Sequence, residues 1–261
     1  MRLKFILFSL ATIFAFQTTT AQTVEEIIAN YFENTGGADN WKSLKGIKMT
    51  ASINQGGMDI PITMIMMADG RRHMKFELQG KELVQGVFDG EVMWGHNFMT
   101  MEPEKSDSEA TENAKREAGD FPDPFLNLEG NGYSAELLGK ETVEGTECFK
   151  VKLTKKPQLV DGVEVDNISY YFFDTENFVP IVVETEIKSG QMKGQIGIAT
   201  FSDYQEVEGL YFAFAIGEGI KDMGTQVINI TGIELNPDVE DTMFKFPEPV
   251  ETTEEKEGEG N

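Results

Sequence analysis

The residue types that most often carry out catalysis or bind metals are sparse in this sequence. Its two histidines, His73 and His96, have no second histidine, cysteine or carboxylate at the spacing of a metal site. Cys148 is the only cysteine, which excludes an internal disulfide. Neither histidine is near Cys148 in sequence, so the thiol has no evident base to activate it. These residues predict neither a zinc site nor a catalytic cysteine.

Carboxylates near one strand turn are the other candidate for chemistry. Asp203, Glu206 and Glu208 could form an acid pair, but carboxylates beside a turn are more simply explained by contact with solvent. The sequence contains no glycine-rich phosphate loop, nucleophile elbow or dinucleotide fingerprint. We therefore expect a protein that is not an enzyme and that uses no cofactor and no metal.

Large, flexible apolar side chains are concentrated in a short stretch instead. Residues 58–76, MDIPITMIMMADGRRHMKF, contain five methionines and the turn sequence Ala-Asp-Gly-Arg. Apolar and polar residues alternate before the turn, and this period of two predicts a β-strand with one apolar face. The apolar positions of that strand are Met58, Ile60, Ile62, Met64 and Met66. The pattern identifies a buried face but not whether that face is packed solid or left open.

The N-terminus has the pattern of an export signal. Arg2 and Lys4 precede an apolar run from residue 5 to residue 16, and small residues end at Ala21. We predict cleavage after Ala21 and a periplasmic protein that does not span the membrane, because the apolar run is short for a bilayer. Gln22 follows the cleavage site, where a lipid-modified protein would have cysteine.

Acidic residues dominate the charge of the chain. Removal of the signal leaves 20 basic and 45 acidic residues, a net charge of −25. Such a charge repels nucleic acid and anionic lipid surfaces, so we expect no nucleic-acid partner. Most of these carboxylates are interpreted as solubilising, and we expect a monomer.

One helix and a long series of strands follow the signal. Thr23 and Glu26 form a capping box, apolar residues then recur at helical spacing, and Gly36 and Gly37 end the helix. A second helical turn is expected at 38–44. The period then becomes two and predicts an antiparallel meander of about 11–12 strands. These are expected at 47–53, from Met58 to the turn at Asp69, and at 74–78, 82–88, 91–98, 133–139, 148–154, 167–173, 179–188, 194–204, 210–217 and 226–235.

The meander is interrupted between Met99 and Asn131. Residues 102–120 have almost no apolar stripe and predict at best a solvated helix. The next residues, DFPDPFLNLEGNG, contain two prolines and four large apolar residues, Phe121, Phe125, Leu126 and Leu128. A loop of this length is often a lid or binding element, although an ordinary loop packed on the core is the alternative. The acidic residues 251–261 are predicted to be disordered.

The order of these elements carries a resemblance to a known family. The stretches VFDGEVMWGHN, LLGKETVEGTECFKVKL, YYFFDTENFVPIVVETE, FSDYQEVEGLYFAFAI and NPDVEDTMFKFP occur in this order after the helix. In this arrangement the chain resembles the outer membrane lipoprotein-sorting proteins, the LolA-like periplasmic carriers. The resemblance covers nearly the whole mature chain, which we expect to form one domain over residues 22–250. It implies a mainly β fold: a curved, incomplete antiparallel β-barrel, or half-barrel, with an N-terminal helix and a helix and loop lid, near residues 102–131, over the concave face.

The resemblance also implies an apolar cavity that holds acyl chains. Methionine suits such a cavity because its side chain is polarizable, flexible and tolerant of misfit. The residues predicted to contact lipid are Ile62, Met64, Met66, Met74, Phe76 and Trp94 on the strands, and Phe125 and Leu126 in the lid. The alternative is that these side chains are ordinary core beneath the first helix. Arg71 and Arg72 are expected to lie exposed at their turn.

The function implied is shielding of lipoprotein or lipid acyl chains in the periplasm during transport to the outer membrane. Two alternatives with the same fold remain. One is a lipid-responsive sensor or regulatory module that acts on an envelope protein partner, and the other is a structural envelope protein with a filled core.

Overall fold

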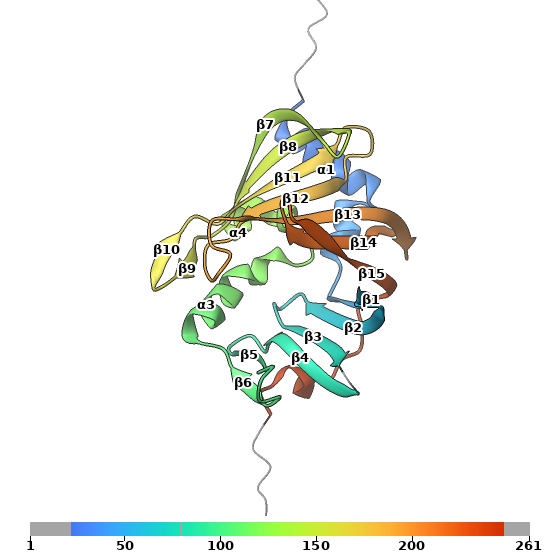
Figure 1. Ribbon diagram of the computed structural model, residues 1–261. Coiled ribbons are helices and arrows are strands. Elements are labelled where there is room, and N and C mark those ends of the chain that lie inside the picture. The colour runs from blue at the N-terminus through green and yellow to red at the C-terminus, as the bar shows by residue number, and fades with distance from the viewer. Residues whose placement is uncertain (1–21, 79, 248–261) are drawn as a thin grey trace, which may run out of the picture.

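The computed structural model describes residues 22–78 and 80–247, and these residues are mostly antiparallel strands (Figure 1). Thirteen strands form one sheet in the order β6-β5-β4-β3-β2-β1-β15-β14-β13-β12-β11-β8-β7. In the described residues the edge strands β6 and β7 do not pair with each other, so the sheet curves without closing. The predicted fold class is confirmed, with 13 strands in the sheet rather than 11 or 12. The predicted signal peptide and the predicted acidic tail lie outside the described residues.

The first half of the sheet is a series of hairpins. Its strands are β1 (Gly46–Gln55), β2 (Met58–Met67), β3 (Arg72–Leu78), β4 (Lys81–Phe88), β5 (Met93–His96) and β6 (Pro103–Lys105). Side chains close the turns: Asn54 accepts a hydrogen bond from the Gly57 N–H at 3.2 Å, and Asp69 accepts one from the Arg71 N–H at 3.1 Å. The first and last long strands, β1 and β15, pair at the centre of the sheet.

The second half of the sheet carries a small additional hairpin. The strands are β7 (Ser134–Val143), β8 (Thr146–Thr154), β11 (Ile168–Asp174), β12 (Pro180–Glu186), β13 (Ile196–Val207), β14 (Leu210–Ile220) and β15 (Gly224–Leu235). Between β8 and β11 the chain forms a separate pair, β9 (Gln158–Val160) and β10 (Val163–Val165). The two three-residue strands of this hairpin are not among the strands predicted from the sequence.

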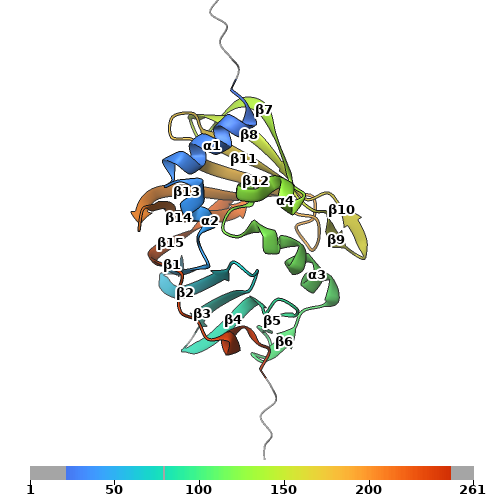
Figure 2. The same ribbon diagram turned by 180° about the vertical axis from the view of Figure 1, so that it is seen from behind.

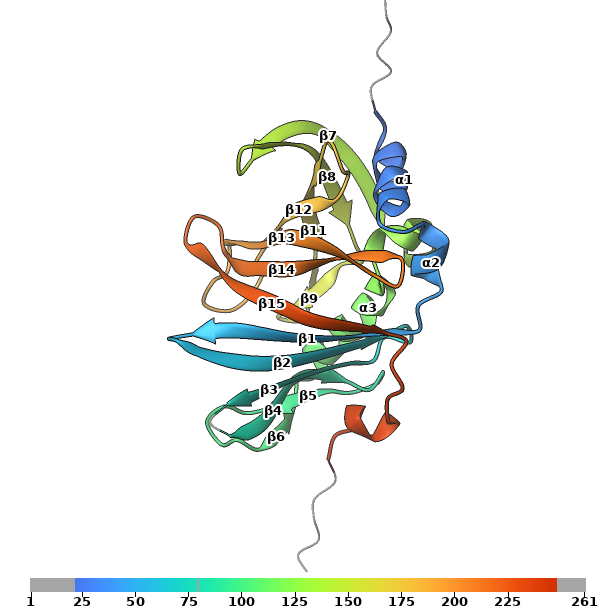
Figure 3. The same cartoon turned by 90° about the vertical axis from the view of Figure 1, so that its right-hand side faces the viewer.

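Two N-terminal helices, α1 (Val24–Asn34) and α2 (Ala38–Lys42), cover one end of the curved sheet (Figures 2 and 3). The predicted capping box is present, because Thr23 accepts from the Glu26 N–H and Glu26 accepts from the Thr23 N–H. Gly36 ends α1 with φ at +109°, and a Cβ there would collide with the carbonyl oxygen of Gly209. Glycine at this position therefore allows close contact between the helix end and the β13–β14 turn.

The interruption in the meander folds as a chain of short helices. These are α3 (Ser108–Glu117), η1 (Ala118–Asp120), η2 (Pro124–Asn127) and α4 (Leu128–Asn131). Helix α3 packs against β5 and β9, and so bridges the two halves of the sheet (Figure 1). Ala114 is the one buried side chain of α3. A helix that buries so little needs no apolar stripe, which explains why the sequence shows almost none. We call residues 108–131 the lid segment.

Buried apolar side chains gather on both faces of the sheet. The largest cluster joins the helices to the concave face and includes Ile27, Phe32, Trp41, Phe125 and Phe173. A second cluster lies on the outer face, where the C-terminal η3 (Asp241–Phe244) places Phe244 against Ile65, Val87 and Trp94. A third, also on the outer face, contains Cys148, Phe172 and Val182. Among the described residues, no helix is long and apolar enough to cross a membrane.

Candidate functional site

Methionines from three neighbouring strands form one wall of the concave face. Met49 of β1 is the register partner of Met64 on β2, and Met64 is the partner of Met74 on β3. Register partners in an antiparallel sheet project to the same face, so these three side chains form a ladder across the strands. Ile62 and Phe76 form the next rung toward one end, and Ile47 and Met66 the next rung toward the other.

Part of this concave face forms an open-sided cavity of about 240 Å³. Apolar side chains dominate its wall, with tyrosines and one carboxylate among them. The strands contribute Ile47, Met49, Met66, Tyr171, Pro180, Phe201, Tyr204, Tyr211, Phe212, Ala213 and Ile216; the helices contribute Tyr31 and Trp41; and the lid segment contributes Pro122, Asp123 and Pro124. Such a surface suits a hydrocarbon ligand.

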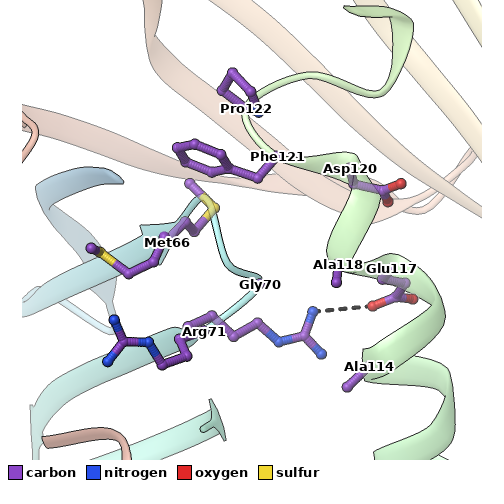
Figure 4. Close-up of a pocket in the computed structure, with 11 residues that line it drawn as sticks. Met66, Gly70, Arg71, Ala114, Glu117, Ala118, Asp120, Phe121 and Pro122 are labelled. Atoms are coloured by element: carbon purple, nitrogen blue, oxygen red, sulfur yellow. Dashed lines mark hydrogen bonds and ion pairs between the residues drawn. The ribbon is translucent and has the colours of Figure 1, made fainter. Parts of the chain in front are cut away.

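A second, smaller hollow of about 140 Å³ lies between the β2–β3 turn and the lid segment (Figure 4). Met66 and Pro122 line both the hollow and the cavity, so the two are neighbours separated by these side chains. The methyl group of Ala118 and the ring of Phe121 form its lid side.

Aromatic packing anchors the lid segment at η2. The ring of Phe125 is buried and makes edge-to-face contacts with Tyr171 and Phe173, at centroid distances of 4.8 Å and 5.6 Å. Pro122 and Pro124 restrict the backbone on either side of Asp123 and place the carboxyl against the cavity. The lid is therefore held by one deeply inserted ring next to a polar group.

Asp123 is a half-buried carboxyl in an otherwise apolar environment. It accepts hydrogen bonds from the Tyr31 hydroxyl at 2.9 Å and from the Phe125 N–H at 2.8 Å. Burial raises the pKa of Asp123 to about 6, although both hydrogen bonds oppose that rise. Burial also raises the pKa values of Tyr31, Tyr171 and Tyr204, and the nearby Asp123 adds to each rise. Asp123 is thus the titratable contact between the lid and α1.

Replacing Asp123 by asparagine should change how stability depends on pH. The folded-state pKa of Asp123 is raised above its ordinary value of 3.8, so the folded protein binds more protons than the unfolded chain between these two pH values. Stability from this group is therefore greatest below about pH 4 and is lost as the pH rises through about 6. At pH 8 we expect the free energy of unfolding of Asp123→Asn to exceed that of the wild type by about 1–2 kcal/mol. At pH 4 we expect no such gain.

Urea denaturation of both proteins at pH 4, 6 and 8 measures this difference. The matched control is Asp107→Asn, which changes an exposed carboxylate at the start of α3. A gain for Asp123→Asn that is equal at every pH would show that the carboxyl is not held in its protonated form by the lid.

Polar contacts hold the rest of the lid segment to both halves of the sheet. Arg72 of β3 forms an ion pair with Glu117 of α3 at 3.1 Å. Asp120 accepts from Lys155 at 2.6 Å and from the Tyr133 hydroxyl at 2.8 Å. These pairs are partly exposed, and each contributes on the order of 1 kcal/mol or less to stability. They therefore hold the lid segment in place only weakly.

The β9–β10 hairpin grips α3 through backbone groups. Asn113 accepts from the Leu159 N–H at 2.7 Å and donates to the Leu159 carbonyl at 2.9 Å. Glu109 accepts from the N–H groups of Asp161 and Gly162, at 3.2 Å and 2.7 Å. The side chain of Asn113 therefore pairs with the backbone of β9 much as a neighbouring strand would, and ties the hairpin to α3.

The predicted lipid-contacting residues lie in three places: on the concave face, in the core under the lid segment and, for Trp94, on the outer face. Met66 lines the cavity, and Ile62, Met64, Met74 and Phe76 share its concave face beyond the cavity. Phe125 and Leu126 belong to the core under the lid, where they anchor the lid rather than line the cavity.

Trp94 requires a correction. It packs on the outer face with Phe244 and Phe246, and its Nε1 donates to the Phe244 carbonyl at 2.9 Å. The C-terminal segment supplies this second apolar layer, which the alternation of the strand alone does not indicate. Trp94 is therefore not part of the candidate site.

The remaining candidates for chemistry lie in structural positions. His96 accepts a hydrogen bond from the Val84 N–H through Nδ1 at 3.0 Å, and burial lowers the pKa of His73. Burial also raises the pKa of the Cys148 thiol, which makes it less reactive. In residues 22–78 and 80–247 no group of three or more metal-ligand side chains occurs. Arg71, expected to be exposed, instead pairs with Asp69 and Asp241.

The fold and the cavity together define a class: an open antiparallel half-barrel with an apolar cavity on its concave face, bordered by a helical segment. A LolA superfamily protein from Nitrosomonas europaea has a similar structure, with a TM-score of 0.52, 15% sequence identity, and coverage of 86% of this chain and 98% of that one. The predicted resemblance to LolA-like proteins is therefore confirmed at the level of the fold. No family model matches the sequence, and no curated protein matches it.

Two further structures are similar at lower scores. A DUF1329 family protein from Desulfovibrio piger has a TM-score of 0.48 and 14% identity, with 86% of this chain and 98% of that chain covered. A domain described as an outer membrane lipoprotein-sorting protein, from Vibrio parahaemolyticus, has a TM-score of 0.48 and 11% identity, with 84% and 94% covered.

Proposed function

We propose that this chain is a periplasmic carrier that shields the acyl chains of lipoproteins or lipids during transport to the outer membrane. The observation that carries this proposal is the unfilled apolar cavity on the concave face, bounded by the lid segment. The methionine ladder of Met49, Met64 and Met74 extends the same surface beyond the cavity. Flexible thioether side chains suit a ligand whose length and bends vary.

Physical chemistry supports a gated cavity. Each methylene exposed to water costs about 0.8 kcal/mol, so a long acyl chain needs cover worth on the order of 10 kcal/mol. The open-sided cavity of about 240 Å³ is below the usual range of about 300–1,000 Å³ for ligand sites. A long chain therefore requires the lid segment to move, which the weak polar contacts of Arg72 and Asp120 allow. The structure described is the closed state in this proposal.

Protein made in its own host provides the test. Native mass spectrometry and organic extraction should detect a bound amphiphile, and delipidated protein should bind a fluorescent fatty-acyl probe in competition with that amphiphile. Absence of both results would contradict the proposal and favour a structural envelope protein. Bound lipid without transfer to acceptor vesicles, together with one stoichiometric protein partner, would favour the lipid-responsive sensor.

A further inference from the structure

Exposed large apolar side chains are concentrated at one end of the sheet. Four segments carry them: the β1–β2 turn (55–58), the β5–β6 loop (97–101), the β12–β13 loop (187–195) and the β14–β15 turn (221–224). The exposed fractions are 65% for Met58, 55% for Phe98, 91% for Met99, 43% for Met192 and 71% for Met223. We call these five side chains the apolar rim.

Hydrogen bonds link the β14–β15 turn region to its neighbours on both sides, and a ring contact places the β5–β6 loop beside β3. The Lys221 N–H donates to the Ile196 carbonyl at 2.9 Å and links the β14–β15 turn to the β12–β13 loop. Gln226 donates to the Asn54 carbonyl at 3.1 Å and links β15 to the β1–β2 turn. Phe98 lies against Phe76, at a centroid distance of 5.9 Å, near the end of β3. The apolar rim therefore follows the curve of the sheet.

The apolar rim lies at the end of the strands opposite α1 and α2. The helices contact the other end, where the Tyr211 N–H donates to the Thr35 carbonyl at 3.1 Å beside the β13–β14 turn. Figure 3 shows the β1–β2 and β14–β15 turns pointing away from the two helices. The rim is therefore clear of α1 and α2, whereas the β12–β13 loop lies beside α3, with which it lines a shared hollow.

Charge is distributed in a way that sets this end apart. Acidic residues make up 45 of the 261 residues, but the four segments contain one, Asp222, among 22 residues. Their basic residues are largely neutralised, because Lys188 pairs with Glu186 at 2.7 Å and Lys221 pairs with Glu184 at 2.6 Å. The four segments therefore carry little net charge in a chain whose net charge is −23, although Asp59 and Glu102 follow two of them directly. A near-neutral apolar edge on an acidic body matches an uncharged or zwitterionic surface.

The spacing of the rim side chains indicates what kind of partner surface they fit. Each methionine stands on its own turn, so no pocket or continuous patch is formed that a folded partner would fill. A fluid surface can take up single side chains one by one, while the polar turn residues around them stay at the level of the head groups. We propose that the apolar rim docks this protein on a zwitterionic phospholipid bilayer. This surface is separate from the acyl-chain cavity and goes beyond the proposed function.

Vesicle flotation of the mature chain, residues 22–261, tests the proposal. Wild-type protein should float with vesicles of phosphatidylcholine and phosphatidylethanolamine. Inclusion of phosphatidylglycerol at low salt should reduce binding, because the acidic body is repelled. A variant with Met58→Ser, Phe98→Ser, Met99→Ser, Met192→Ser and Met223→Ser should partition at least about tenfold less. Leu138→Ser, which removes an exposed leucine from the middle of β7, should float like the wild type.

Affinity for the fatty-acyl probe, measured on the same variants, separates this proposal from the proposed function. The same variant with Phe98 left in place, so that no contact of Phe76 is removed, should retain the probe affinity of the wild type, which also shows that it is folded. Wild-type protein that does not float, or a five-residue variant that floats equally well, would overturn bilayer docking. A wild-type dimer that the five substitutions convert to a monomer, with no vesicle binding by either protein, would instead assign the rim to a second copy of this chain.

Discussion

Replacing Met49 by glutamate should weaken binding of a fluorescent fatty-acyl probe by about 100-fold, which corresponds to about 3 kcal/mol. Met49 lines the cavity and stands beside Met64 in the ladder. A carboxylate there must either lose its hydration when the probe binds or bring water into the apolar space, and both cost binding free energy. Isothermal titration or fluorescence at pH 8 measures the dissociation constant.

The neighbouring residue provides the matched control. Thr50→Glu introduces the same charge one position along β1, on the opposite face and exposed to solvent, and should leave the affinity within about twofold. Met49→Trp tests the same site by bulk instead of charge and should also weaken binding. If Met49→Glu and Thr50→Glu bind the probe equally, the ligand does not occupy this cavity.

The alternation of apolar residues allowed prediction of the strands, but not of all their partners. In β2 the period of two identified Ile62, Met64 and Met66 as one face, and the structure places all three on the concave side. Met49 belongs to the same ladder, yet its membership depends on the register between β1 and β2. Side-chain period gives the face of a strand, whereas register comes from pairing between strands.

Short elements and long-range contacts account for most of the rest. The strands β9 and β10 have three residues each, too few for an alternation to be recognised. Helix α3 lacks an apolar stripe because side chains such as Asn113 and Glu109 tie it to the backbone of the β9–β10 hairpin, about 50 residues away in sequence. Trp94 was assigned to the wrong face because Phe244, 150 residues later, supplies its packing partner.

Polar residues of the site were the hardest to predict. Asp123 sits between two prolines and reads as an ordinary loop residue, but the fold brings it to Tyr31, 92 residues away. Arg72 follows a turn and was expected to be exposed, yet it reaches Glu117 of the lid helix. Each of these contacts joins the lid segment to a part of the chain far away in sequence, so no local sequence pattern predicts the contact.

Truncating Phe125 to alanine should release the lid while leaving the cavity wall in place. Removal of a buried aromatic ring costs about 3–5 kcal/mol, and here the lost contacts with Tyr171 and Phe173 fasten the lid segment. Amide hydrogen exchange at residues 118–131 should therefore speed up by about 100-fold or more. The fatty-acyl probe should enter faster by a comparable factor in stopped-flow fluorescence, since lid opening precedes binding.

A matched truncation elsewhere in the same cluster distinguishes an anchor from general destabilisation. Phe32→Ala removes an equally buried ring from α1, and should lower the free energy of unfolding without selectively exposing residues 118–131 to exchange. The anchor role of Phe125 predicts fast loading with a dissociation constant changed by less than about threefold, because the ring does not line the cavity. A large loss of affinity with normal lid protection would instead make Phe125 a direct lipid contact, as the sequence first indicated, and would require the ligand to reach beneath η2.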